Sequence, residues 1–417
     1  MTASTSFGPV LAHLPGLLAA DPLLDKVDGT TVIFVIVKAV LTFVILLVTV
    51  IFVIWWERKL ISYMQNRVGP AETGPFGLGQ TLADGIKILF KEGLTPRRAD
   101  KRVFRLAPYL AVVPAFLTFA IVPIGGAITI GHRTTMLQLA DPPIGILWML
   151  AMSGVAVYGV MLAGWSSGSK YPLLGSVRAS AQMISYEAAL GLSIASVVLV
   201  SGSLSTRDVV LAQAGRGIGG IIPNWNVVQL AFVPFVIFML AATAEMNRPP
   251  FDLTEAESEL VAGYMTEYSS AGFMFFYLAE FMNLVTMSAI MTTLFFGGPA
   301  GPWHPNLPVL RWAVPVAYFV IKVFIFISVY VWIRATLPRL RYDQLMDLGW
   351  KVLIPIALFW LLVIAAIKAD RVYTAYCLVG FILGAAGLYR ALRVGHERAE
   401  AQRAVESAAR RSVGERR

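Results

Sequence analysis

One apolar run in this sequence is long enough to decide what kind of protein the chain forms. The run VIFVIVKAVLTFVILLVTVIFVIWW, from Val32 to Trp56, contains a single charged residue, Lys38. A helix rising 1.5 Å per residue needs about 20 apolar residues to cross the roughly 30 Å of hydrocarbon in a bilayer. The run therefore predicts a membrane-spanning helix. Only 14% of all residues are charged, against about 25% in soluble domains, so we expect an integral membrane protein.

Similar apolar runs recur along the whole chain and predict an all-α, polytopic membrane protein. Periods of high hydropathy indicate nine spans. These are Val32–Trp56, Pro108–Ile130, Ile144–Trp165, Ala181–Val200, Val227–Ala244, Ala271–Phe296, Trp312–Ile333, Trp350–Ile367 and Val372–Tyr389.

The first long loop contains a further helix that is too short and too charged to span. In FGLGQTLADGIKILFKEG, apolar residues recur every three or four positions, opposite a charged side. We expect this helix to lie along the membrane interface. The apolar positions are Leu78, Leu82, Ile86 and Leu89, and the charged ones are Asp84, Lys87 and Lys91.

The distribution of Lys and Arg predicts the orientation. Ten of them lie between Arg58 and Arg105, and cytoplasmic loops carry the excess of positive charge. The N-terminus is then outside, and the arginine-rich C-terminus is cytoplasmic. The expected parts are a periplasmic extension 1–31, a transmembrane domain 32–367, an extra transmembrane helix 368–390 and a basic tail 391–417.

The cysteine and histidine content excludes several kinds of site. The chain has one cysteine, Cys377, whereas an iron–sulfur cluster needs about four ligands. The four histidines are scattered, without the spacing of metal ligands. We therefore expect neither a metal site nor a covalently bound cofactor in this chain.

Two carboxylates fall inside predicted spans, where an isolated charge costs about 2.5 kcal/mol or more near the bilayer centre. Glu280 lies near the midplane of its span, on one helical face with Phe273 and Tyr277. Glu187 lies about two turns below the cytoplasmic end of its span. Both acids fit a proton pathway, and both also fit hydrogen bonds between helices. We expect Lys38 and Lys322, near span ends, to snorkel to the surface.

The segment AEMNRPPFDLTEAESELVAGYMTEYS opposes the basic trend of the other cytoplasmic loops. Asn-Arg-Pro-Pro ends a span, and Asp252 fits the N-cap of a short helix with Glu255 three residues later. The acids form either a solvated charge run or a protein-covered site that stores protons. Against the one cation, Arg248, stand Glu245, Asp252, Glu255, Glu257, Glu259 and Glu267.

Basic residues flank the same side of the membrane. Glu57 and Arg58 follow the first span, and Arg334 and Arg339 follow the seventh. They fit either positive-inside anchoring or the lining of a polar entrance.

Five blocks of the sequence together resemble the quinone-site membrane subunit family (the H subunits) of respiratory complex I, the proton-translocating NADH:quinone oxidoreductase. The resemblance covers about Val32 to Ile367 and implies eight transmembrane helices. The blocks are ERKLISYMQNRVGP, GPFGLGQTLADGIKILFKE, AEMNRPPFDLTEAESELVAGYMTEYS, YLAEFMNLVTMSAIMTTLFFGG and WIRATLPRLRYDQLMDLGWK. The ninth span, the tail and the N-terminal extension depart from this pattern.

The resemblance implies a function and roles for particular residues. The family forms the quinone-access channel and couples quinone reduction to proton translocation through carboxylates. The residues that match the channel are Glu57, Arg58, Phe273, Tyr277 and Arg334. Those that match the proton pathway are Glu187, Glu245, Asp252, Glu255, Glu257, Glu259, Glu267 and Glu280.

The resemblance also implies partners and a location. Quinone is the substrate, while FMN and iron–sulfur clusters are expected on partner subunits, so this chain alone would be inactive. The expected partners are the quinone-site subunits of the hydrophilic arm, small subunits of the membrane arm and lipid, with no nucleic acid. The expected location is the bacterial plasma membrane.

Other functions remain open from the residues alone. The nearest is the membrane anchor of a related energy-converting hydrogenase, which would lack quinone. A stand-alone secondary transporter would show inverted repeats, and no convincing internal repeat is visible. A purely structural anchor would leave Glu280 and the acidic segment without a role.

Overall fold

The structure, a computed structural model, describes residues 29–130, 133–215, 224–252, 261–301, 308–369 and 390. The chain divides into two compact units, Met1–Ala357 and Leu358–Arg417. The described part of the second unit is the remainder of helix α13 and Arg390. The predicted span Val372–Tyr389, the basic tail, Cys377 and nearly all of the N-terminal extension lie outside the described residues.

Among the described residues, seven helices are long and apolar enough to cross a membrane, which confirms the all-α polytopic fold. The last span runs without a break from Tyr342 to Ala369 through a π-helical turn. The elements of these spans are α2 (Gly29–Met64), α4 (Lys101–Phe119), α5 (Gly145–Ser166), α6 (Lys170–Ser201), α10 (Ser270–Phe295), α11 (Pro308–Thr336), α12 (Tyr342–Asp347), η5 (Leu348–Leu353) and α13 (Ile354–Ala369).

The second span differs from its prediction at both ends. Asp100 caps α4 by accepting from the backbone of Arg102 and Val103, so the helix begins before Pro108 and contains this proline and Pro114. Proline inside a spanning helix is tolerated because neighbouring groups satisfy the freed carbonyls. The predicted end at Ile130 is wrong, because residues 127–130 form a strand. Strands β1 (Ala127–Ile130) and β2 (Arg133–Met136) pair as an antiparallel hairpin.

The fifth predicted span, Val227–Ala244, is broken. It consists of α8 (Asn226–Gln229) and α9 (Val233–Glu245), and α9 is shorter than a full span. Between them Ala231 and Phe232 have positive φ angles of 51° and 64°, and a proline follows in the first turn of α9. Proline fits the first turn because its missing N–H would be unpaired there anyway.

Several spans are longer than predicted, and in two of them this changes the depth of an acid. Helix α6 begins at Lys170 rather than Ala181, so Glu187 lies at the middle of the helix and not near its first turns. Helix α2 continues to Met64, so Glu57 is inside the helix rather than after it. Hydropathy ends a span where polarity begins, whereas helical hydrogen bonding continues beyond the apolar part.

The predicted amphipathic helix is confirmed as α3 (Gln80–Leu89). Its apolar residues Leu82, Ile86 and Leu89 are exposed on this chain. The remaining elements are short and lie in loops. They are η2 (Pro75–Gly77), α7 (Thr206–Ala212) and η4 (Gly263–Met265).

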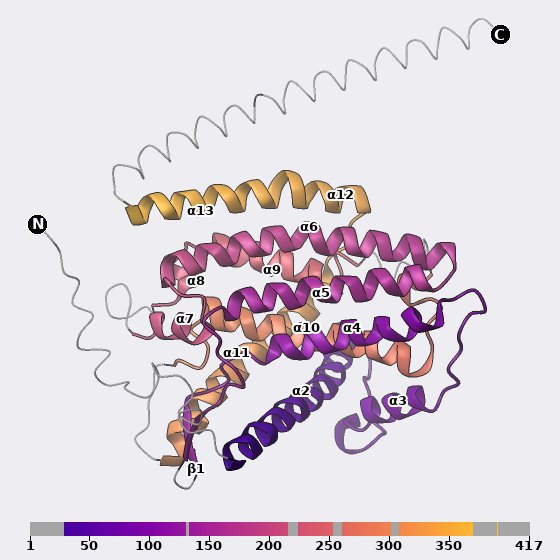
Figure 1. The fold of residues 1–417 in the computed structure, drawn as a ribbon, viewed down its shortest axis with the longest axis horizontal. Coiled ribbons are helices and arrows are strands. Elements are labelled where there is room, and N and C mark those ends of the chain that lie inside the picture. Colours follow the sequence, from indigo (N-terminus) through magenta and orange to yellow (C-terminus); the bar gives the residue numbers. More distant parts are fainter. Residues whose placement is uncertain are drawn as a thin grey trace, which may run out of the picture. The chain divides into compact units, whose positions relative to one another are not determined.

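Helix α10 is the most buried of the spanning helices. It packs against α2, α4, α9 and α11, and every residue from Leu284 to Phe295 is buried. Helices α4, α5 and α6 pack in chain order, and α2 runs obliquely to this row (Figure 1). The α4–α5 contact is close because Gly159 has no side chain: a Cβ there would lie 2.9 Å from the Ala111 nitrogen.

Neither lysine expected to snorkel extends freely to the surface. Lys38 donates to Thr135 Oγ1 of the hairpin over 3.2 Å. Lys322 of α11 donates to the carbonyl oxygens of Phe296, Gly298 and Ala300 over 2.8, 2.9 and 2.7 Å. These carbonyls lie just after the C-terminal end of α10, where the helix dipole favours a cation. We call Lys322 and these three carbonyls the lysine cage.

Candidate functional site

A turn after α9 points Arg248 into the protein. Helix α9 ends at Glu245, and Asn247 has a positive φ of 51°. Pro249 and Pro250 follow, and proline cannot donate a backbone hydrogen bond. Arg248 is only 3% exposed, so its charge requires compensation from other buried groups.

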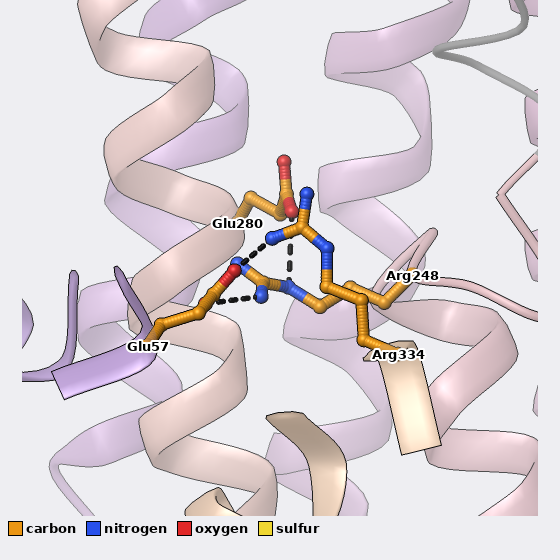
Figure 2. Close-up of polar contacts among 4 residues, drawn as sticks. All are labelled: Glu57, Arg248, Glu280 and Arg334. Atoms are coloured by element: carbon orange, nitrogen blue, oxygen red, sulfur yellow. Dashed lines mark hydrogen bonds and ion pairs between the residues drawn. The ribbon is translucent and has the colours of Figure 1, made fainter. Parts of the chain in front are cut away.

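Two acids from different helices compensate this charge. Arg248 Nη1 lies 2.7 Å from Glu57 Oε2 of α2, and Arg248 Nε lies 3.1 Å from Glu280 Oε1 of α10 (Figure 2). The guanidinium centre also lies 4.3 Å from the centroid of the Phe281 ring, within the range of a cation–π contact. Residues 57, 248 and 280 are thus brought together from far apart in the sequence.

Arg334, in the last turn of α11, completes the group. Its Nη1 contacts Glu57 Oε1, so this one carboxylate binds two guanidinium groups (Figure 2). The Arg334 side chain is 32% exposed, whereas those of Arg248 and Glu57 are 4% and 6% exposed. We call Glu57, Arg248, Glu280 and Arg334 the ion cluster. Two acids and two cations make it formally neutral, which offsets part of the cost of removing them from water.

The other residues matched to the channel lie beside the ion cluster or point away from it. Arg58 turns toward α3 and contacts Asp84 over 2.5 Å, with its side chain 41% exposed. The rings of Phe273 and Tyr277 stack with centroids 6.1 Å apart. Tyr277 in turn lies 4.8 Å from Phe281. The rings at 273, 277 and 281 therefore form a row along α10 that ends at Arg248.

Glu245 lies next to the ion cluster and is 5% exposed. One of its oxygens accepts a hydrogen bond from Ser153 of α5. Within the described part of the chain, the other, Oε2, has no hydrogen-bond partner. A cavity of about 30 Å³ adjoins both Glu245 and Glu280 and is also lined by Asn247, Tyr264 and Asn283. This volume and its polar lining suit a water molecule that would join the two acids.

The remaining acids matched to the proton pathway extend on both sides. Glu187 of α6 faces α5, where a Cβ on Gly154 would lie 3.6 Å from its Oε1. Asp252 is 6% exposed and lies 3.8 Å from Arg339. Glu267 is half-buried just before α10. Glu255, Glu257 and Glu259 lie outside the described residues, as does the helix that Asp252 was expected to cap.

Tyr268 fixes the start of α10. Its hydroxyl donates to the carbonyl oxygen of Phe104, and the two rings stack 4.0 Å apart. Burial raises the pKa of Tyr268 to about 12, so it stays protonated at neutral pH.

Sequence reasoning noted Arg248 only as the one cation among six carboxylates and assigned it no role. The structure places it at the centre of the ion cluster. Its isolation was the available signal, because a single cation amid buried acids is the group they must share. In the regions that the structure describes, no three His, Cys, Asp or Glu side chains gather as metal ligands.

Comparison with known proteins gives one family. The profile described as NADH dehydrogenase matches residues 37–365. The chain is 47% identical over 404 residues to the NADH-quinone oxidoreductase H subunit of Frankia alni, covering 95% of this chain and 87% of that protein. It is 50% identical over 345 residues to the H subunit of Streptomyces avermitilis, covering 81% and 74%. An H subunit of Koribacter versatilis is 48% identical over 356 residues, covering 82% and 99%.

Proposed function

The chain belongs to the NADH dehydrogenase family, as a membrane subunit of an NADH-quinone oxidoreductase, and we propose that it forms the quinone-access channel and couples quinone reduction to proton translocation. The resemblance read from the five sequence blocks is thereby confirmed. The names of these relatives favour this function over a hydrogenase anchor or a stand-alone transporter. The observation that carries the proposal is the ion cluster, which joins a row of aromatic rings on one side to a cavity between two acids on the other.

The row of aromatic rings along α10 and the side chain of Arg334 support the proposal of a quinone channel. Phe273 and Tyr277 offer flat apolar surfaces that suit a quinone ring and its tail. Arg334 is partly exposed, so its guanidinium remains able to donate to a quinone carbonyl while it contacts Glu57. Arg58, paired with Asp84, would border the channel from the side of α3.

The acids support the proton pathway. Reduction of quinone to quinol takes up two electrons and two protons, so the reduced quinone would carry negative charge beside Arg334 until both protons arrive. Glu57 shares its two oxygens between Arg334 and Arg248, so a change at either cation alters the hold of Arg248 on Glu280. Glu280 and Glu245 adjoin the same cavity. A proton would then pass from Glu280 through water to Glu245 and on toward Glu187. In the segment between α9 and α10, the pathway would include the acids Asp252, Glu255, Glu257, Glu259 and Glu267.

The complex supplies what this chain lacks. We expect FMN, iron–sulfur clusters and the rest of the quinone site on partner subunits of a hydrophilic arm, and small membrane-arm subunits beside the spans. The multi-pass chain would lie in the bacterial plasma membrane with the N-terminus outside, as the distribution of Lys and Arg predicts.

The test uses the intact complex carrying Glu280→Gln or Glu245→Gln. NADH-driven quinone reduction and proton uptake are measured in vesicles. Electron transfer to an artificial acceptor, which takes electrons from the hydrophilic arm alone, is measured in the same preparation. The matched control is Glu72→Gln, which neutralises an exposed acid in the loop before α3.

We expect both pathway variants to lose proton uptake while artificial-acceptor activity is retained, and the control to match the wild type. Wild-type proton uptake in both variants would overturn the proposed pathway.

A further inference from the structure

The turn that carries Arg248 is held partly by its own backbone and partly by groups from other segments. Pro249 and Pro250 remove two backbone donors in succession. The backbone bonds that remain are from Phe251 N to the Arg248 carbonyl oxygen over 2.9 Å, from Asn247 N to that of Ala244 over 3.2 Å and from Arg248 N to that of Thr243 over 3.4 Å. The carbonyl oxygens of Pro250 and Phe251 accept hydrogen bonds from other segments of the protein, as backbone acceptors in a protein interior must.

Gln182 of α6 supplies two of these bonds. Its Nε2 donates to the carbonyl oxygen of Ala244 over 2.7 Å and to that of Phe251 over 2.7 Å. Gln182 is 0% exposed. The two acceptors lie four residues before and three residues after Arg248, so a single side chain joins the two ends of the turn.

A primary amide suits this position better than any other neutral side chain. Both partners are carbonyl oxygens, and only an NH2 group offers two donors from one uncharged atom. A third anchor is the backbone of Leu340, which donates to the Pro250 carbonyl oxygen over 3.0 Å. The turn is therefore held from α6 on one side and from the segment after α11 on the other.

We propose that Gln182 is a positioning residue that aims Arg248 at Glu57 and Glu280. The proposal rests on the proposed function, since it assumes that the ion cluster serves quinone reduction. Arg248 is shared between two acids on separate helices, at 2.7 and 3.1 Å. If the turn could shift, Arg248 would pair with one of the two acids and lose its contact with the other. Gln182 also binds the carbonyl oxygen of Ala244, and the next residue, Glu245, adjoins the cavity.

The test compares two glutamines in the intact complex. Gln182→Met keeps the volume and removes the donors. Gln138→Met is the matched control, because Gln138 is also buried and donates to the Ile121 carbonyl oxygen and to Thr206 Oγ1 over 2.9 and 3.0 Å. Its partner Thr206 lies beyond the far end of α6, about 30 Å along the helix from Gln182 at 1.5 Å per residue.

Loss of two buried hydrogen bonds predicts a fall of about tenfold in kcat for quinone reduction by Gln182→Met, with KM within about twofold of the wild type. Artificial-acceptor activity should stay unchanged, and Gln138→Met should leave kcat unchanged. If Gln182→Met fails to assemble, Gln182→Asn replaces it, since its shorter amide cannot reach both carbonyls.

A second readout separates positioning from general support of the fold. In an Arg248→Lys complex, whose point charge already lacks the two-sided geometry of a guanidinium, Gln182→Met should cause little further loss. Losses that multiply, or equal losses for Gln182→Met and Gln138→Met, would overturn the positioning role. Should Arg248→Lys itself reduce quinone at the wild-type rate, the proposed function of the ion cluster would fail instead.

Discussion

The ion cluster and the lysine cage both compensate a cation inside the helix bundle, but with different partners. Arg248 is compensated by two carboxylates on separate helices. Lys322 is compensated by three backbone carbonyls that follow one helix, with the Trp225 ring centroid 5.1 Å away. Carboxylates gain and lose protons, whereas backbone carbonyls are fixed dipoles. The acceptors of the ion cluster can therefore respond to a change of charge nearby, whereas those of the lysine cage are fixed, so we expect a structural role for the lysine cage.

Both sites contact α10 or the residues that directly follow it. Glu280 lies ten residues after the start of α10, and the lysine cage lies just after its end at Phe295. If the difference in chemistry decides the role, removing the cation should damage turnover at one site and stability at the other.

The largest effect is expected for Arg248→Met. This change leaves Glu57 and Glu280 buried without the cation that they share, and breaking a buried ion pair costs about 3–5 kcal/mol. If the same cost is added to the activation free energy, the rate of quinone reduction by the assembled complex should fall about 100-fold or more. Retention of more than half of the wild-type rate would place the ion cluster in the same structural class as the lysine cage.

A smaller and different effect is expected for Lys322→Met. Three carbonyls after α10 lose their donor, at about 1–3 kcal/mol for each buried unsatisfied group, reduced where water can enter. The half-life of thermal inactivation in detergent should shorten, while kcat of the complex that remains folded stays at the wild-type value. A fall in kcat without any loss of thermal stability would break the proposed division between the two sites.

The smallest effect is expected for Asp84→Asn, which removes the partner of Arg58. Their side chains are 33% and 41% exposed, and exposed pairs contribute about 0–1 kcal/mol. Quinone reduction should change by less than about fivefold, and the difference from the wild type should shrink as salt rises, because screening weakens the pair already present. A large effect that does not depend on salt would extend the ion cluster to Arg58.

The sequence predicted the spans better than it predicted their ends. The length of the apolar run was sufficient to predict that α2 and α10 span the membrane, because insertion into lipid depends on composition. It failed at Phe232, where residues with positive φ divide an apolar run, and at Ile130, where three successive β-branched residues belong to a strand. Hydropathy does not distinguish these backbone conformations.

The candidate site was predicted as a set of residues but not as an arrangement. Glu57, Glu280 and Arg334 were named through the family resemblance, and the structure joins them. Arg248, which pairs with both Glu57 and Glu280, was missed, as was the supporting Gln182. Ion pairs between residues up to 191 positions apart leave no local pattern in the sequence. Arg58 was grouped with Glu57 through the resemblance, yet it points toward Asp84 of α3, since successive residues on a helix point about 100° apart.

The most direct test of the ion cluster as a single unit is a double-mutant cycle of Glu57→Gln and Arg248→Met on NADH-driven quinone reduction. Removing both charges restores neutrality and leaves Arg334 and Glu280 to balance each other. We predict strong non-additivity, with the double variant no slower than Arg248→Met alone. Losses that simply multiply would show that Glu57 and Arg248 act independently and would contradict the account.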